Sequence, residues 1–225
     1  MRVSKWYALA GAVFLVASSQ VSRADTLKFI NSTGQIQDAG SKTVGPEDVY
    51  LYPYNFSVNG SSTTTQLMCV SFDNEITAGE SWDVKIESIA QASANATQLM
   101  NYEADAWLFS QITPSSTSTQ IANVQFAAWA VGDPTVANAT YDPYYAANET
   151  AINQLLSDAF ANATPADLSN YNNYELYVPT SWDSSNGEPQ TFIGPAPAPE
   201  PGTLALLGSG LLGMGGIFRR RMRKA

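Results

Sequence analysis

The sequence predicts an α+β fold, in which a β-rich sandwich or barrel-like domain with a helical middle segment precedes a single C-terminal transmembrane helix. Apolar and polar residues alternate from Trp82 to Glu87, which is the period of a half-buried strand. Between residues 104 and 160, apolar residues recur instead at helical spacing. Residues 202–218 carry no charge and are about as many as a membrane-spanning helix needs.

Strands are predicted on both sides of the helical segment. Residues 26–30, 49–58 and 66–72 are the candidates before Trp82, and residues 174–178 and 190–193 are those after the helices. Pro53 marks an edge or a bend within the second candidate, because proline cannot donate to a strand ladder. Asn59-Gly60 supplies the positive φ angles of a hairpin turn between the second and third strands.

Three helices are predicted in the middle of the chain from stripes of apolar residues. The first stripe holds Ala104, Trp107, Leu108 and Ile112, and the second holds Ile121, Val124, Ala128 and Val131. The third helix extends from about Asn148 to Ala161 and aligns Ile152, Leu155, Leu156, Ala159 and Phe160 on one side.

The composition excludes several classes of function. The 225 residues include no histidine and one cysteine, so the chain can form no Ser-His-Asp or Cys-His pair, no imidazole metal site and no internal disulfide. All 20 acidic residues lie between Asp25 and Glu200, where Lys28, Lys42 and Lys85 leave a net charge of −17. Such a stretch repels nucleic acid, so we expect no nucleic-acid partner. We predict no cofactor, no metal site and no enzymatic turnover.

The N-terminus is typical of a secretory signal peptide, which we assign to residues 1–24. Two basic residues precede an apolar run over residues 6–17, and the run is too short for a preferred membrane span. The polar end Ser22-Arg23-Ala24 has the small-x-small form of a cleavage site. We therefore expect cleavage between Ala24 and Asp25, and an exported acidic domain over residues 25–194.

The C-terminus reads as a stalk, a membrane helix and a basic tail. Prolines at alternate positions make residues 195–201 an extended spacer. The apolar residues 202–218 follow as the predicted transmembrane helix, and residues 219–225 carry the basic cluster. Because basic residues remain in the cytoplasm, the acidic domain is expected on the outer side of the inner membrane.

These C-terminal residues resemble a known sorting signal. Pro199, Glu200 and Pro201, the apolar helix, and a cluster that begins with Arg219, Arg220 and Arg221 are similar to the PEP-CTERM signal of exported proteins in Gram-negative bacteria. The resemblance implies export through the Sec translocon, anchoring by the helix, and processing by an exosortase, a membrane cysteine protease. It also implies a final place in the cell envelope, on the surface or in the extracellular matrix, with extracellular polysaccharide and biofilm as the setting.

Cys69 and Gln125 form the pair with the most informative chemistry. Cys69 lies in an apolar strand, and Gln125 points into the apolar side of its own helix, where an unpaired amide costs about 1–3 kcal/mol. Attack of the thiolate on the carboxamide, with loss of ammonia, would use both groups in an internal thioester. The pair resembles the thioester domains of bacterial surface adhesins. That resemblance implies covalent attachment to an amine-bearing or hydroxyl-bearing partner.

Three neighbours of the pair are candidate supporting residues. Phe126 and Trp129 would screen the bond from water, and Asp73 would orient an incoming amine. The alternatives are a cysteine and a glutamine that only pack in the core, and an intermolecular disulfide. Two further functions stay open. One is a biofilm matrix protein that is structural or binds exopolysaccharide noncovalently, with tyrosine rings stacked on the sugars. The other is a glycan-processing enzyme that uses two carboxylates.

Overall fold

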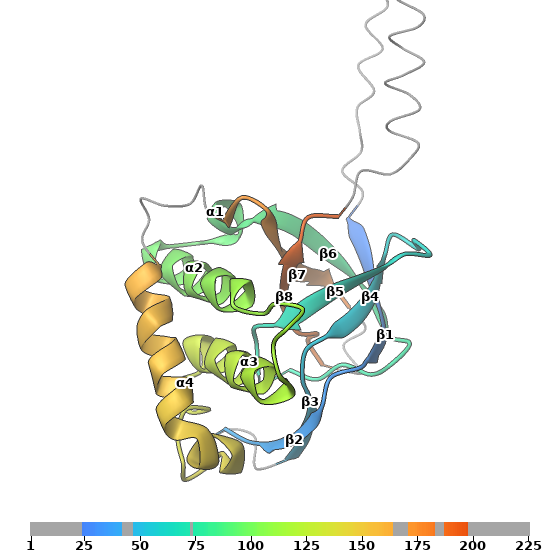
Figure 1. Ribbon diagram of the computed structural model, residues 1–225. Coiled ribbons are helices and arrows are strands. Elements are labelled where there is room, and N and C mark those ends of the chain that lie inside the picture. Colours follow the sequence, from blue (N-terminus) through green and yellow to red (C-terminus); the bar gives the residue numbers. More distant parts are fainter. Residues whose placement is uncertain (1–23, 42–46, 73, 164–170, 183–186, 198–225) are drawn as a thin grey trace, which may run out of the picture.

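The computed structural model describes residues 24–41, 47–72, 74–163, 171–182 and 187–197, which form a β-barrel flanked by helices (Figure 1). Six strands close the barrel in the order β1-β4-β5-β8-β7-β6, and every neighbouring pair is antiparallel. The barrel strands are β1 (Asp25–Ser32), β4 (Tyr54–Val58), β5 (Thr64–Cys69), β6 (Ser81–Ser88), β7 (Tyr174–Ser181) and β8 (Phe192–Pro195). The barrel alternative of the predicted fold class is confirmed.

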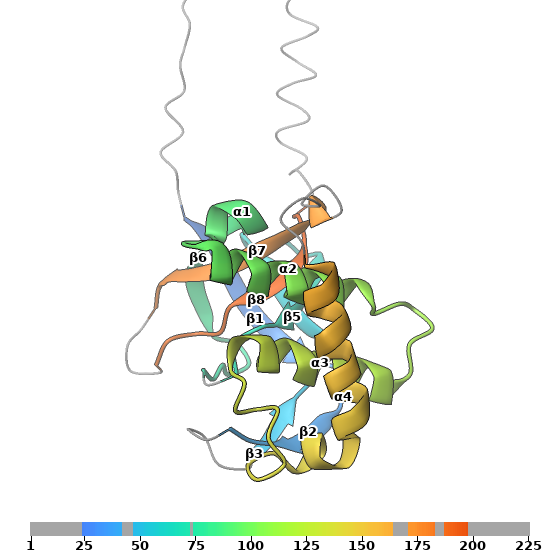
Figure 2. The ribbon, with the colours of Figure 1, turned by 90° about the vertical axis from the view of Figure 1, so that its left-hand side faces the viewer.

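The remaining elements are a small sheet and four helices. The strands β2 (Ile36–Ala39) and β3 (Glu47–Tyr50) pair only with each other. Figures 1 and 2 show α2, α3 and α4 on one side of the barrel, and Figure 1 shows α2 and α3 between the barrel and α4. The helices are α1 (Ile89–Ala92), α2 (Ala96–Ser110), α3 (Ser118–Gly132) and α4 (Pro143–Asn162).

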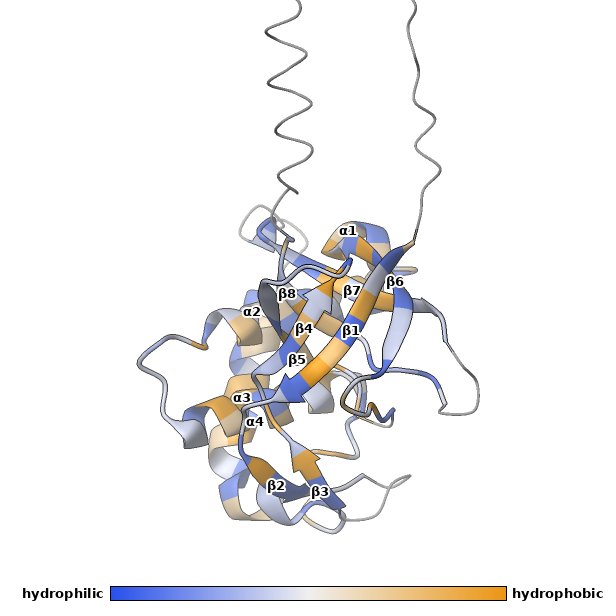
Figure 3. Ribbon diagram, turned by 90° about the vertical axis from the view of Figure 1, so that its right-hand side faces the viewer, coloured by the Kyte–Doolittle hydropathy of each residue, from blue (hydrophilic) through white to orange (hydrophobic). Residues whose placement is uncertain are grey.

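The barrel interior follows from alternation along its strands. Along β1, Leu27 and Phe29 are buried while Lys28 between them is exposed, and this alternation is visible in Figure 3. Inside the barrel, the ring of Phe192 lies 4.6 Å from that of Phe56 and 6.5 Å from that of Trp82, measured between centroids. Burial of large apolar side chains on one face of each strand therefore sets the strand register.

The predicted hairpin at Asn59-Gly60 is confirmed, and the strand before it is shorter than predicted. Asn59 and Gly60 have φ angles of 53° and 73°, and they connect β4 to β5. Residues 49–58 do not form one strand, because the chain bends at Pro53, which lacks the N–H of a strand ladder. The first part of that segment, β3, pairs with β2, which the sequence did not predict.

The helices differ from the prediction mainly at their ends. Helix α2 ends at Ser110, so Ile112 lies beyond it. Helix α4 begins before Asn148, at Pro143, because Asp142 caps it by accepting a hydrogen bond from the Tyr145 N–H. Phe160, placed on the apolar stripe of α4, is 39% exposed.

Within the described ranges, no helix is both long and apolar enough to cross a membrane. The predicted transmembrane helix over residues 202–218 lies outside those ranges, as do the greater part of the signal peptide and the basic tail. Ala24 is the first described residue, and β1 begins at Asp25, the residue predicted to start the mature chain.

Candidate functional site

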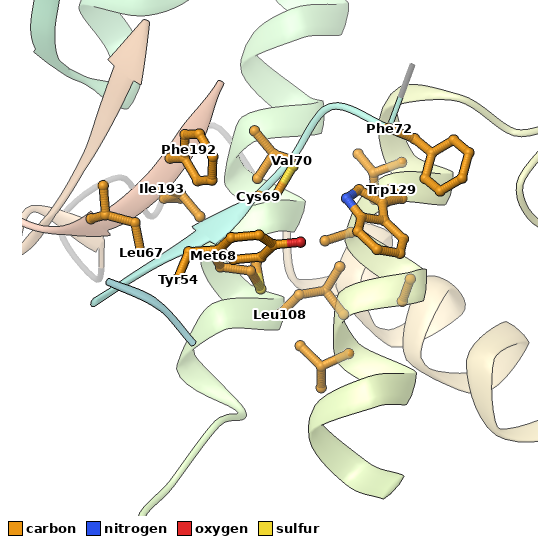
Figure 4. Packing of buried hydrophobic residues seen from close by; sticks show 14 of the residues in the cluster. Tyr54, Leu67, Met68, Cys69, Val70, Phe72, Leu108, Trp129, Phe192 and Ile193 are labelled. Carbon is orange, nitrogen blue, oxygen red and sulfur yellow. The ribbon is translucent and has the colours of Figure 1, made fainter. Parts of the chain in front are cut away.

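Cys69 is the last residue of β5 and lies where the barrel meets the helices (Figure 4). It pairs with Phe192 of β8 in the ladder, and its side chain is completely buried. Its thiol donates a hydrogen bond to the Ser71 carbonyl oxygen, with Sγ and the oxygen 3.0 Å apart. The end of a barrel strand therefore fixes this nucleophilic atom in an apolar environment.

Gln125 reaches the same place from α3. Its Nε2 donates a hydrogen bond to the Cys69 carbonyl oxygen at 2.6 Å, so the structure brings together two residues that are 56 positions apart. Gln125 is completely buried, and its Oε1 has no hydrogen-bond partner among the described residues. An unpaired buried carbonyl of this kind lowers the free energy of unfolding by about 1–3 kcal/mol. Packing alone therefore does not explain why a glutamine occupies this position.

The environment keeps the Cys69 thiol protonated. The pKa of Cys69 is raised to about 12, mainly by burial and to a smaller extent by the charge of Asp105. The Trp129 side chain and the hydrogen bonds of Ser71 act in the opposite direction and lower the pKa. The sulfur is therefore a thiol at neutral pH, and any attack that it makes needs a group to accept its proton.

Two of the three predicted supporting residues lie next to this pair in the core. Trp129 is 1% exposed, and Figure 4 shows it beside the end of β5, near Cys69. The Phe126 ring lies 5.2 Å from the Trp129 ring and stacks on Tyr144 at 4.3 Å, between centroids. Both rings are buried, whereas Asp73 lies outside the described residues.

Trp129 also lines a cavity of about 230 Å³. Tyr54, Phe72 and Trp129 contribute to its apolar lining, and Tyr54 also interacts electrostatically with Cys69. The lining includes three carboxylates, from Glu47, Asp48 and Glu75. Burial, followed by the charge of Glu75, raises the pKa of Glu47, so two of these acids lie close together. Tyr54, Phe72 and Trp129 thus line an acidic cavity and also lie around the buried cysteine in Figure 4.

Asp105 and Glu103 are buried acids that sequence reasoning missed. Both belong to α2, and they are 2% and 1% exposed. Helical spacing could have indicated the burial of Asp105, because Asp105 lies three positions before Leu108, a residue of the predicted apolar stripe, and so shares its side of the helix. Burial raises the pKa of both carboxyl groups, and raises that of Asp105 well above its ordinary value.

The predicted sorting residues lie outside the described part of the chain, but comparison with known families tests them. Residues 197–224 match the model of the PEP-CTERM protein-sorting motif, which includes Pro199, Glu200, Pro201, Arg219, Arg220 and Arg221. No curated protein and no solved structure matches the chain. The C-terminus thus carries a PEP-CTERM sorting motif, and the protein is exported, processed by an exosortase and directed to the cell surface or beyond it.

Proposed function

We propose that the exported domain attaches covalently to a partner through an internal thioester between Cys69 and Gln125. The observation that supports the proposal is the placement of the Gln125 carboxamide, whose Nε2 donates a hydrogen bond to the main-chain carbonyl oxygen of Cys69. Both residues are completely buried, and Gln125 keeps one unpaired oxygen in a site that excludes water. A reactive acyl group survives in water only where such exclusion exists.

In this reaction the Cys69 thiol and the Gln125 carboxamide form one thioester, which reacts once with the partner. The Cys69 sulfur bonds to the side-chain carbonyl carbon of Gln125, the carbon–nitrogen bond of the amide breaks, and the thiol proton leaves with the nitrogen as ammonia. A primary amine of the partner later attacks the same carbon. The new amide bond then joins the partner to Gln125, and the sulfur returns as a thiol. The protein is consumed in the attachment, so it is not a catalyst of many turnovers.

The acidic cavity beside Trp129 supports a cationic amine as the partner group. Lysine side chains are ammonium ions at neutral pH, and the carboxylates of Glu47 and Glu75 would attract them and accept a proton from them. The neutral hydroxyl group of a sugar has no such attraction. We therefore infer that the partner presents a lysine or another primary amine, on a surface protein or in the extracellular matrix.

A second candidate, noncovalent binding of exopolysaccharide, is favoured by exposed aromatic side chains. Tyr50 lines the acidic cavity and is 51% exposed, and Trp182 is 36% exposed. Aromatic rings of this kind stack on sugar rings. Such binding would not depend on Cys69, and this independence separates the two candidates.

Labelling with a biotinylated primary amine tests the covalent function. The exported protein is incubated with the amine or with a matched biotinylated alcohol, and transfer is followed by blotting after denaturation. We expect transfer from the amine, none to Cys69→Ala, and slower transfer to a variant with both Glu47→Gln and Glu75→Gln. Equal labelling of the wild type and Cys69→Ala would contradict the proposal, and binding of polysaccharide by both would favour the second candidate.

A further inference from the structure

The acidic cavity has no basic residue in its described lining. Glu47, Asp48 and Glu75 contribute three carboxylates to it. Lys28 and Lys85 are the only basic side chains in the described ranges of the chain, and neither lines the cavity. Burial first, and then the charge of Glu75, disfavours the ionised form of Glu47. A cation inside the cavity would favour that form, so the lining suits a positively charged ligand.

Four buried aromatic rings line the same cavity, and they come from separate segments of the chain. Phe29 of β1 and Tyr54 of β4 have their ring centroids 6.0 Å apart, and those of Phe72 and of Trp129 on α3 are 5.0 Å apart. Figure 4 shows Tyr54, Phe72 and Trp129. Aromatic faces attract organic cations. Among the described residues, no group of three acidic or cysteine side chains is placed to hold a metal ion. The lining therefore favours an organic cation over a metal ion.

Gln190 gives the cavity a buried hydrogen-bond acceptor that lacks a donor. It lines the cavity and is 9% exposed, and its Oε1 has no hydrogen-bond partner among the described residues. Its Nε2 donates to the main-chain carbonyl oxygen of Asn74, and the Asn74 Nδ2 donates to that of Pro189 at 3.3 Å. These two bonds hold the amide in place. A buried amide oxygen requires a donor, which a ligand with N–H groups supplies and a quaternary ammonium ion does not.

We propose that this cavity binds an organic cation with N–H donors, the ammonium or guanidinium group at the end of a lysine or arginine side chain. The carboxylates attract the cation, the aromatic rings pack against its alkyl stem and its charged end, and the Gln190 Oε1 accepts one N–H. The binding is reversible and needs neither Cys69 nor Gln125. It therefore goes beyond the proposed covalent function and does not rest on the thioester.

Titration with small cations tests the site in the full chain carrying Cys69→Ala, which cannot form a thioester that an amine would consume. The ligands are n-butylammonium, n-butylguanidinium and n-butyltrimethylammonium, with n-butanol as the neutral control, and NMR follows their proton signals in detergent without other amines. We expect saturable binding of the first two, with their methylene signals shifted upfield by the aromatic rings, and no binding of n-butanol. The quaternary cation should bind about tenfold more weakly, because it cannot donate to Gln190.

Two pairs of substitutions separate the cavity from general attraction by the acidic domain. Glu47→Gln together with Glu75→Gln should weaken the binding of n-butylammonium about fivefold. The matched control, Glu149→Gln together with Asp158→Asn on α4, removes the same charge outside the cavity lining and should leave the affinity unchanged. Gln190→Leu should remove the preference for n-butylammonium over the quaternary cation. Thermal melts show whether each variant is folded.

The outcomes of this test are independent of the proposed function. The absence of saturable binding, or an equal loss of affinity in the cavity pair and in the control pair, would overturn the cation site. A quaternary cation that binds as tightly as n-butylammonium would overturn the role of Gln190 and the requirement for N–H donors. If Gln190→Leu does not fold, this ratio of affinities decides alone. Failure of amine labelling in the wild type would contradict the thioester and leave cation binding by the Cys69→Ala protein in place.

Discussion

Buried polar side chains are paired more completely in the barrel strands than in the helices α2 and α3. In the wall, Asn55 of β4 donates from Nδ2 to Asn31 at 2.8 Å and accepts at Oδ1 from Gln66 at 3.4 Å. Among the described residues, Trp82 Nε1 is the one buried side-chain N or O atom of the barrel strands without a partner, whereas Gln125 on α3 and Asp105 and Glu103 on α2 each keep at least one unpartnered oxygen. Unpaired buried groups lower stability, and proteins keep them where they serve a function. The comparison therefore supports the helical side of the barrel as the place of the candidate site.

The largest loss of stability is expected for Phe192→Ala in the barrel. Phe192 is completely buried, and its ring contacts those of Tyr54 and Phe56 at 5.6 and 4.6 Å between centroids. The substitution leaves a cavity and should lower the free energy of unfolding by about 3–5 kcal/mol. Urea unfolding measures the change. A loss below about 1 kcal/mol would show that the barrel interior does not provide the main core.

The substitution Asp105→Asn should raise stability at neutral pH, in contrast to the barrel substitution. Burial raises the pKa of folded Asp105 well above 3.8, so the wild type is most stable where the acid is protonated in both states. Its stability falls as the pH rises from about 4 through the folded pKa, by at most about 1.4 kcal/mol per pH unit.

Urea unfolding at several pH values, in a Cys69→Ala background that removes any thioester, measures this effect. Asparagine imitates the neutral acid, so the advantage of the Asp105→Asn variant should widen with pH from near zero at about pH 4. A constant difference between the two proteins at all pH values would show that Asp105 does not titrate with an elevated pKa.

A smaller loss is expected at Asp142, which connects α4 to the end of β2. Its carboxylate accepts the Tyr145 N–H at 2.7 Å and the Gly40 N–H at 3.2 Å. Asp142→Ala should lower the free energy of unfolding by about 1–2 kcal/mol, and Asp142→Asn by less, because the amide oxygen still accepts.

The same residue contributes a pH dependence that the asparagine variant should lack. Burial raises the pKa of Asp142 from 3.8 to about 6. The stability that the higher folded pKa contributes is therefore present below about pH 4 and is lost as the pH rises from about 4 to about 6. Thermal unfolding of the wild type and Asp142→Asn at about pH 4 and 7 checks both statements. Identical pH dependence in the two proteins would contradict them.

The smallest effect is expected in the β4–β5 turn, at the surface of the barrel. Asn59 has a φ of 53°, and its Oδ1 accepts the Thr26 N–H at 2.9 Å. Asn59→Ala should lower stability by about 0.5–1 kcal/mol, since alanine tolerates this conformation less well and cannot accept the bond. Asn59→Gly is the control, because glycine restores the conformation but not the bond. A larger loss for glycine than for alanine would contradict this account of the turn.

Local pattern predicted much of the fold, and long-range pairing accounts for the rest. The alternation around Trp82 and Val84 and the Asn59-Gly60 turn are local signals, and both elements formed as predicted. The closure of the barrel depends on β5 pairing with β8, which follows it by more than a hundred residues. The short strand β2 has no local signal, since it forms only because β3 lies beside it.

The site could be predicted only in part, for a similar reason. A glutamine on an apolar helix side gave a signal for Gln125, and a cysteine in an apolar strand gave one for Cys69. The hydrogen bond between Gln125 and Cys69 depends on how α3 packs against β5, which the sequence does not encode locally. Asp105 is a more difficult case, because an acidic residue in a helix normally faces water.

The intact mass of the exported protein tests the central claim most directly. The protein is purified near neutral pH without amines and weighed before and after exposure to methylamine, beside Cys69→Ala and Gln125→Ala. The account predicts a wild-type mass short by one ammonia, which methylamine raises above the unmodified value, and no change in either variant. An unmodified wild-type mass with a freely titrating thiol after unfolding would contradict it.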